Sequence, residues 1–170
     1  MTLNDGASAA VQTSTAAVAI ALGNKLTVAT AESLTAGMVA ATLANTPGAS
    51  GMLQGGVVAY QNSVKAGVLG VSQELLAEVG SVDGRVAEAM ADGARRVCGA
   101  DLGISTTGVA GPEPHDGKAV GTVFIGIAGK SGTEAFEYSF SGDRQSIREQ
   151  ACEAALARLL AALSDVGYRS

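Results

Sequence analysis

The sequence has 170 residues, of which 47% are apolar and only 4% aromatic, and its net charge at pH 7 is −5. This length fits one domain, and the acidic charge argues against a protein that wraps a phosphate backbone. Trp is absent and only three Tyr and three Phe are present, so stacking of single-stranded bases is poorly supported. We therefore expect no nucleic-acid partner, whereas a small anionic ligand needs only one or two local cations.

Cysteine and histidine are too scarce to build a zinc site, since Cys98, Cys152 and His115 are the only such residues. Both cysteines fall in stretches predicted to be helical, where we expect small buried side chains. The N-terminus lacks the basic and apolar regions of a secretory signal, and no segment has the apolar length of a membrane span. The sequence thus predicts a cytoplasmic protein with no metal, cofactor or membrane partner.

Apolar periodicity and turn residues predict alternating helices and strands. Residues 1–12 are small and polar, and we expect a flexible N-terminal segment there, followed by a single domain over residues 13–165. The expected helices cover residues 13–22, 36–44, 62–69, a short stretch from Ser72, 82–97 and 143–163. The expected caps are Thr35 or Ser33 for the second helix, Ser72 for the short stretch and Asp143 for the last helix. The expected strands cover residues 26–30, 57–60, 102–106, 120–128 and 133–140, the last two joined as a hairpin, and residues 108–118 form a loop. This order predicts an α/β fold, a three-layer α/β/α sandwich with a mixed, mostly parallel sheet of about five strands.

Hydrolytic chemistry needs a nucleophile and a base, and few residues here can supply the base. Only His115 could serve a Ser-His pair, and it falls in the loop at residues 108–118. A lysine can serve instead if burial or nearby cations make it neutral. Lys65 follows a predicted strand that could neighbour the one ending near Ser33. Taken alone, Ser33 is more typical of a helix cap and Lys65 of a solvated surface residue.

Five motifs in order change that interpretation. They are Ala31–Gly37 (AESLTAG), Gly56–Lys65 (GVVAYQNSVK), Gly108–Pro112 (GVAGP), Val120–Val123 (VGTV) and Phe140–Arg144 (FSGDR) with Ile147-Arg148 after it. This set resembles the CinA C-terminal domain family, from about residue 26 to about residue 160. Members with an assigned activity are nicotinamide-nucleotide amidases, which recycle pyridine nucleotide by converting nicotinamide mononucleotide to nicotinate mononucleotide and ammonia. The domain also occurs fused behind a larger domain in competence- and damage-associated proteins.

The resemblance implies roles for individual residues. Ser33 matches the serine of the A-E-S-x-T-x-G motif and is the implied nucleophile. Tyr60 and Lys65 match the Y-x-N-x-x-K motif and are the implied proton-transfer partners. Arg144 of the G-D-R motif is a partner for the substrate phosphate. The family often has Cys-Thr-Gly-Gly after the serine, where residues 34–37 here read Leu-Thr-Ala-Gly, and residues 113–118 lack a pair of glycines common in the family. Both departures concern substrate fit rather than the catalytic residues.

Backbone groups complete the expected site. The N–H groups of Leu34, Thr35 and Ala36, which follow the serine at the start of a helix, can point at a developing oxyanion. The loop at residues 107–111 can close over the substrate. Glu32 could orient Lys65 or a sugar hydroxyl, or it could be a solvated or capping carboxylate. The expected substrate-binding residues are Glu32, Leu34, Thr35, Ala36, Gly37, Thr107, Gly108, Gly111 and Arg144.

The sequence therefore predicts a metal-independent amidase of nicotinamide mononucleotide. A Ser33–Lys65 dyad assisted by Tyr60 would form an acyl-enzyme that water resolves. The alternatives are a non-catalytic, competence- or DNA-damage-associated accessory module that keeps the pocket without turnover, and a hydrolase of another small amide. The C-terminal helix is either core or an oligomer interface, and we expect a homo-oligomer, with a dimer as the simplest case.

Overall fold

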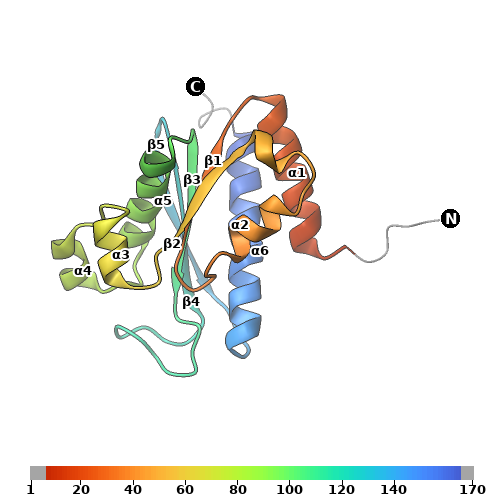
Figure 1. Cartoon of the computed structure of the whole chain (residues 1–170). Helices are drawn as coiled ribbons and strands as arrows, with labels where there is room; N and C mark the ends of the chain where they lie inside the picture. The colour runs from red at the N-terminus through yellow and green to blue at the C-terminus, as the bar shows by residue number, and fades with distance from the viewer. Residues whose placement is uncertain (1–6, 166–170) are drawn as a thin grey trace.

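A five-stranded sheet lies between two layers of helices in the computed structural model of the chain, which describes residues 7–165 (Figure 1). The strands are β1 (Val28–Glu32), β2 (Leu53–Val58), β3 (Leu102–Gly108), β4 (Thr122–Gly129) and β5 (Gly132–Ser139). The helices are α1 (Ala9–Gly23), α2 (Met38–Ala44), α3 (Asn62–Gly67), α4 (Gln73–Val79), α5 (Gly84–Cys98) and α6 (Arg144–Ser164), with a 3-10 turn, η1 (Ala49–Gly51).

The sheet is mixed, with strand order β2-β1-β3-β4-β5. Strand β1 runs parallel to both β2 and β3, whereas β4 runs antiparallel to both β3 and β5. The predicted α/β sandwich with a five-stranded mixed sheet is thus confirmed, with the parallel pairings confined to its β2-β1-β3 half. All residues of β1 are buried, as a strand covered on both faces requires.

Helices cover both faces of the sheet. Helices α1, α2 and α6 form one layer, and α3, α4 and α5 lie on the other side (Figure 1). Helix α5 approaches the sheet closely because Gly103 and Gly126 face its backbone, where a Cβ atom would collide with the carbonyls of Ala91 and Ala87. Within residues 7–165, no helix combines the length and apolar character that crossing a membrane demands.

Several helix and strand boundaries in the structure differ from the predicted ones. Helix α1 begins at Ala9, capped by Ser8, so residues 9–12 are helical and not part of a flexible segment; residues 1–6 lie outside the described range. Strand β2 covers Leu53–Val58 and not the predicted residues 57–60. The prediction began too late because the two glycines in the middle of the strand resemble a break between elements. The predicted caps Ser72 and Asp143 are confirmed, since their side chains accept the N–H groups of Leu75 and Ser146.

Candidate active site

A cleft of about 450 Å³ opens where the parallel strands end. The segments after β1, β2 and β3 all contribute to its wall, with Ser33, Lys65 and Val109 as examples, and Arg144 enters from the start of α6. Ligands of open α/β sheets bind outside the carboxyl ends of the strands, and the volume is in the range of small-molecule sites. The location and size therefore suit a small substrate.

Strand pairing brings the two central segments together. Glu32 and Val58 are paired in the parallel register of β1 and β2, and the N–H of Ala59 donates to the Glu32 carbonyl at 2.8 Å. On the other side, the N–H of Ser33 donates to the Thr106 carbonyl at 2.9 Å. The backbone of Ser33 is thus fixed beside both neighbouring strands, and the chain after β2 turns into α3, which carries Lys65.

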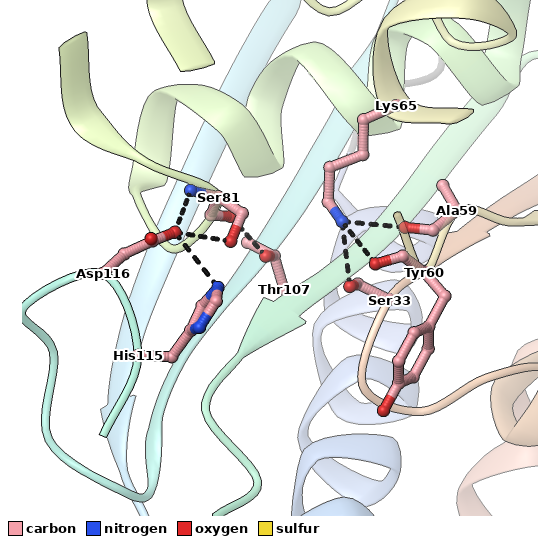
Figure 2. Close-up of polar contacts among 8 residues, drawn as sticks. All are labelled: Ser33, Ala59, Tyr60, Lys65, Ser81, Thr107, His115 and Asp116. Carbon is pink, nitrogen blue, oxygen red and sulfur yellow. Dashed lines mark hydrogen bonds and ion pairs between the residues drawn. The ribbon is translucent and has the colours of Figure 1, made fainter. Parts of the chain in front are cut away.

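The ammonium group of Lys65 is bound directly to Ser33. Its Nζ atom lies 3.0 Å from Ser33 Oγ, 2.8 Å from the Ala59 carbonyl and 3.3 Å from the Tyr60 carbonyl (Figure 2). The lysine side chain is only 1% exposed. Lys65 is therefore not the solvated surface residue that it resembles when taken alone, and the structure pairs it with Ser33.

Burial prepares this lysine to act as a base. Desolvation lowers the pKa of Lys65 from 10.5 to about 8, against a weaker opposing effect of the Asp116 charge. With such a pKa, about a tenth of the side chains are neutral at pH 7. A neutral amine has two N–H bonds, which the carbonyls of Ala59 and Tyr60 can accept. Its lone pair then faces Ser33 Oγ, in the position needed to take the hydroxyl proton.

The residues after Ser33 form a turn before helix α2 begins. The N–H of Ala36 donates to the Ser33 carbonyl at 3.1 Å, so Ala36 is not free to bind an oxyanion. Within residues 7–165, the N–H groups of Leu34 and Thr35 have no hydrogen-bond partner, but Thr35 has no exposed surface and only Leu34 lines the cleft. Of the three expected oxyanion donors, Leu34 is the one that the geometry leaves available.

Glu32 caps helix α2 and does not enter the cleft. Its buried carboxylate accepts the N–H groups of Val39 at 2.8 Å and Ala40 at 3.0 Å, and the Thr35 hydroxyl at 2.7 Å. The expected cap, Ser33 or Thr35, is wrong, because the turn delays the helix until Met38 and the N-cap is Gly37, whose φ is +100°. Of the two roles considered for Glu32, the geometry is that of the capping carboxylate.

Tyr60 presents its backbone, not its hydroxyl, to the dyad. The Tyr60 ring points away from Ser33 and Lys65 (Figure 2), and its hydroxyl accepts a hydrogen bond from Arg144 Nη2 at 2.6 Å. Arg144 Nη1 donates to the Gly111 carbonyl. Arg144 is therefore placed in the cleft, and the Tyr60 hydroxyl belongs to its surroundings rather than to those of Lys65.

The cleft includes only some of the expected binding residues. Those that line it are Leu34, Thr107, Gly108, Gly111 and Arg144, whereas Glu32, Thr35, Ala36 and Gly37 do not. Within the described part of the chain, no group of three or more His, Cys, Asp or Glu side chains could hold a metal ion. Burial raises the pKa of the Cys152 thiol to about 11, which leaves it inert as a nucleophile.

Sequence reasoning missed a network of polar contacts that holds the loop after β3 in place. Asp116 accepts the backbone N–H of Ser81 at 2.7 Å and its hydroxyl at 2.8 Å, and these bonds hold the pKa of Asp116 below its usual value. His115, which lines the cleft, lies 3.3 Å from the Asp116 carboxylate, and Thr107 donates to the Ser81 carbonyl (Figure 2). No local pattern links these positions, because 35 residues separate Ser81 from Asp116.

Comparison with known proteins identifies the family. The family model of the CinA C-terminal domain matches residues 10–163. A putative competence-damage inducible protein of Bacillus pumilus is 47% identical over 139 residues, and a CinA-like protein of Anaeromyxobacter sp. strain K is 52% identical over 139 residues. These matches cover 82% and 80% of this chain but 33% and 34% of the relatives. The chain therefore spans about a third of the length of these curated relatives.

Solved structures match over nearly their whole length. The competence damage-inducible protein A of Klebsiella pneumoniae superposes with a TM-score of 0.89 at 30% identity, covering 92% of this chain and 98% of that one. The competence/damage inducible protein CihA of Agrobacterium tumefaciens gives a TM-score of 0.88 at 31% identity, covering 97% of this chain and 100% of that one. Sequence, fold and motif order agree, and this chain belongs to the CinA C-terminal domain family.

Proposed function

We propose that this protein is an amidohydrolase that converts nicotinamide mononucleotide to nicotinate mononucleotide and ammonia. The observation that carries the proposal is the buried Lys65 Nζ atom, 3.0 Å from the hydroxyl of Ser33 at the wall of the cleft. A lysine held out of water beside a serine is the arrangement that activates a hydroxyl nucleophile without a histidine. The CinA-family resemblance supplies the substrate class.

The first half of the reaction transfers the acyl group to the enzyme. Ser33 Oγ attacks the amide carbon while its proton moves to the neutral Lys65 amine. The carbonyl oxygen becomes an oxyanion, for which the Leu34 N–H is the available backbone donor. When the C–N bond breaks, the Lys65 ammonium returns the proton to the leaving nitrogen, which departs as ammonia and leaves the nicotinate acyl group on Ser33 as an ester.

The second half uses the same residues with water. A water molecule attacks the ester carbon and gives a proton to the neutral Lys65 amine, and a second oxyanion forms at the same place. The ester C–O bond then breaks, Ser33 Oγ takes the proton back from Lys65, and nicotinate mononucleotide leaves. Neither half requires a metal or an electron donor.

The charges around the cleft support an anionic substrate. Lys65 and Arg144 line the cleft and bind carbonyl or hydroxyl oxygens, and within residues 7–165 neither of them forms an ion pair with a carboxylate. Glu113 is the one acidic residue among the described residues that line it. Two N–H groups of Arg144 donate to the Tyr60 hydroxyl and the Gly111 carbonyl, and a guanidinium has five N–H donors. The remaining donors suit a phosphate group.

Ammonia release from nicotinamide mononucleotide, compared with its nucleoside, free nicotinamide and glutamine, tests the proposal. We expect the mononucleotide to have the highest kcat/KM, and Ser33→Ala to lower it at least about 1000-fold because the nucleophile is lost. Ser63→Ala is the matched control, since Ser63 is exposed on α3 and lies outside the cleft. Binding of the mononucleotide without turnover would favour the accessory-module alternative, and a Ser33→Ala variant that remains active would refute the covalent mechanism.

A further inference from the structure

The guanidinium of Arg148 is bound to the backbone of the turn that carries Ser33. Its Nε atom donates to the Leu34 carbonyl at 2.8 Å and its Nη2 atom to the Thr35 carbonyl at 3.4 Å. Arg148 follows Arg144 by four residues on α6, so the two side chains lie on the same face of the helix. Arg144 lines the cleft, whereas Arg148 does not. The second arginine therefore contacts the catalytic segment from outside the substrate space.

Binding a carbonyl also fixes the N–H group of the next residue. A trans peptide is planar, and its C=O and N–H bonds point in opposite directions. The Ser33–Leu34 peptide is held by the bond from the Ala36 N–H to the Ser33 carbonyl. The Leu34–Thr35 peptide that follows it, whose N–H is that of Thr35, is held by Arg148 through the Leu34 carbonyl. Without Arg148, the second peptide of the turn would lose its only side-chain anchor among the described residues.

The far side of the same turn is anchored by a charge of the opposite sign. The Glu32 carboxylate binds the Thr35 hydroxyl and the first N–H groups of α2. Glu32 and Arg148 do not form an ion pair with each other. The Glu32 carboxylate thus binds hydrogen-bond donors of this segment, and the Arg148 guanidinium binds its carbonyl acceptors. Hydrogen bonds to charged groups are stronger than those between neutral groups.

We propose that Arg148 is a positioning residue, which holds the Leu34–Thr35 peptide and with it the turn over residues 33–36, so that Ser33 Oγ stays on Lys65 Nζ and the adjoining peptide keeps the Leu34 N–H toward the oxyanion. This inference rests on the proposed function, because it requires Ser33 to be the nucleophile. It assigns to Arg148 an effect on the chemical step and not on substrate binding, since its side chain lies outside the cleft.

The test compares Arg148→Gln and Arg148→Lys with Arg158→Gln. Arg158 is a matched control on the same helix, where it donates to the Tyr138 hydroxyl at 2.6 Å and lies 3.7 Å above the Phe136 ring, away from the cleft. Three quantities are measured: the rate at which a fluorophosphonate modifies Ser33, followed by mass spectrometry; kcat and KM for nicotinamide mononucleotide; and Tm.

We expect Arg148→Gln to lower kcat and the phosphonylation rate about 10- to 100-fold, with KM changed by less than about threefold. Its Tm should fall no further than that of Arg158→Gln. Arg148→Lys can donate to one of the two carbonyls in the same direction, and its rates should lie in between. If Arg148→Gln fails to fold, the Arg148→Lys rates decide alone.

Rates for the Arg148 variants equal to those of Arg158→Gln would overturn the inference. An increase in KM with kcat unchanged would do so too, since it would place Arg148 in substrate binding. A wild-type protein that is phosphonylated at Ser33 but releases no ammonia contradicts only the proposed substrate, and the phosphonylation rates still decide the role of Arg148. A wild-type Ser33 that does not react would overturn both proposals.

Discussion

The Nζ atom of Lys65 lies 3.0 Å from the Oγ atom of Ser33, although 32 residues separate them in the chain. Parallel pairing of β1 with β2 creates this contact, because both residues follow the carboxyl ends of adjacent strands. The helix that carries Lys65 is only six residues long, so the lysine stays close to the strand end. The dyad is therefore a product of the topology and of the short connection after β2.

The pH dependence of turnover should report the ionisation of Lys65. Burial lowers the pKa of Lys65 to about 8, and only the neutral amine can accept the Ser33 proton. Below that pH, kcat/KM should therefore rise about tenfold per pH unit, and it should level off above it. The measurement is kcat/KM across pH 5.5–10, which reports the free enzyme. A rise centred near the pKa of a solvated lysine would contradict the buried-base assignment.

Lys65→Arg should be nearly as damaging as Lys65→Ala. A guanidinium keeps the positive charge but does not lose its proton in this pH range, so it cannot act as the base. Both variants should lose kcat by a similar factor, measured at pH 8 with circular dichroism as a check of folding. An active Lys65→Arg enzyme would show that the residue acts as a fixed charge, and the base would have to be sought elsewhere.

Local signals were sufficient for most of the fold. Caps at Ser72 and Asp143 and the hairpin between β4 and β5 were predicted from the sequence because each depends on residues close together in the chain. The Ser33–Lys65 contact depends on strand order, which local patterns leave open, and the motif set was needed to favour it over separate roles for the two residues. Arg148 was part of the motif set, but its contacts and those of Asp116 were not predicted for the same reason, since their partners lie 114 and 35 residues away.

Glu32→Gln should destabilise the fold by about 1–3 kcal/mol. The carboxylate accepts three hydrogen bonds from Thr35, Val39 and Ala40, and the amide would turn its NH₂ group toward at least one of these donors. The measurement is the free energy of unfolding in urea. Glu78→Gln is the control, because Glu78 lies in an exposed ion pair with Arg85, and its unfolding curve should match that of the wild type. Equal stabilities of the two variants would contradict the capping role.

Tyr60→Phe should change KM more than kcat. The Tyr60 hydroxyl is bound to Arg144 and has no contact with Ser33 or Lys65, while the backbone carbonyl that contacts Lys65 is retained in the variant. Steady-state kinetics with nicotinamide mononucleotide separate the two effects. A large fall in kcat at unchanged KM would instead restore the proton-transfer role that the motif implies, with the hydroxyl reaching the reacting atoms once substrate is bound.

Arg144→Ala should raise KM for the mononucleotide far more than for the nucleoside. A hydrogen bond between charged groups contributes about 1.5–3 kcal/mol, so KM for the mononucleotide should rise at least about tenfold. The nucleoside has no phosphate, and its KM should change little. Arg144 also supports the Gly111 carbonyl and the Tyr60 hydroxyl, so its loss could alter the shape of the cleft. That effect would act on both substrates alike, and an equal rise in both KM values would show that Arg144 shapes the cleft rather than binding phosphate.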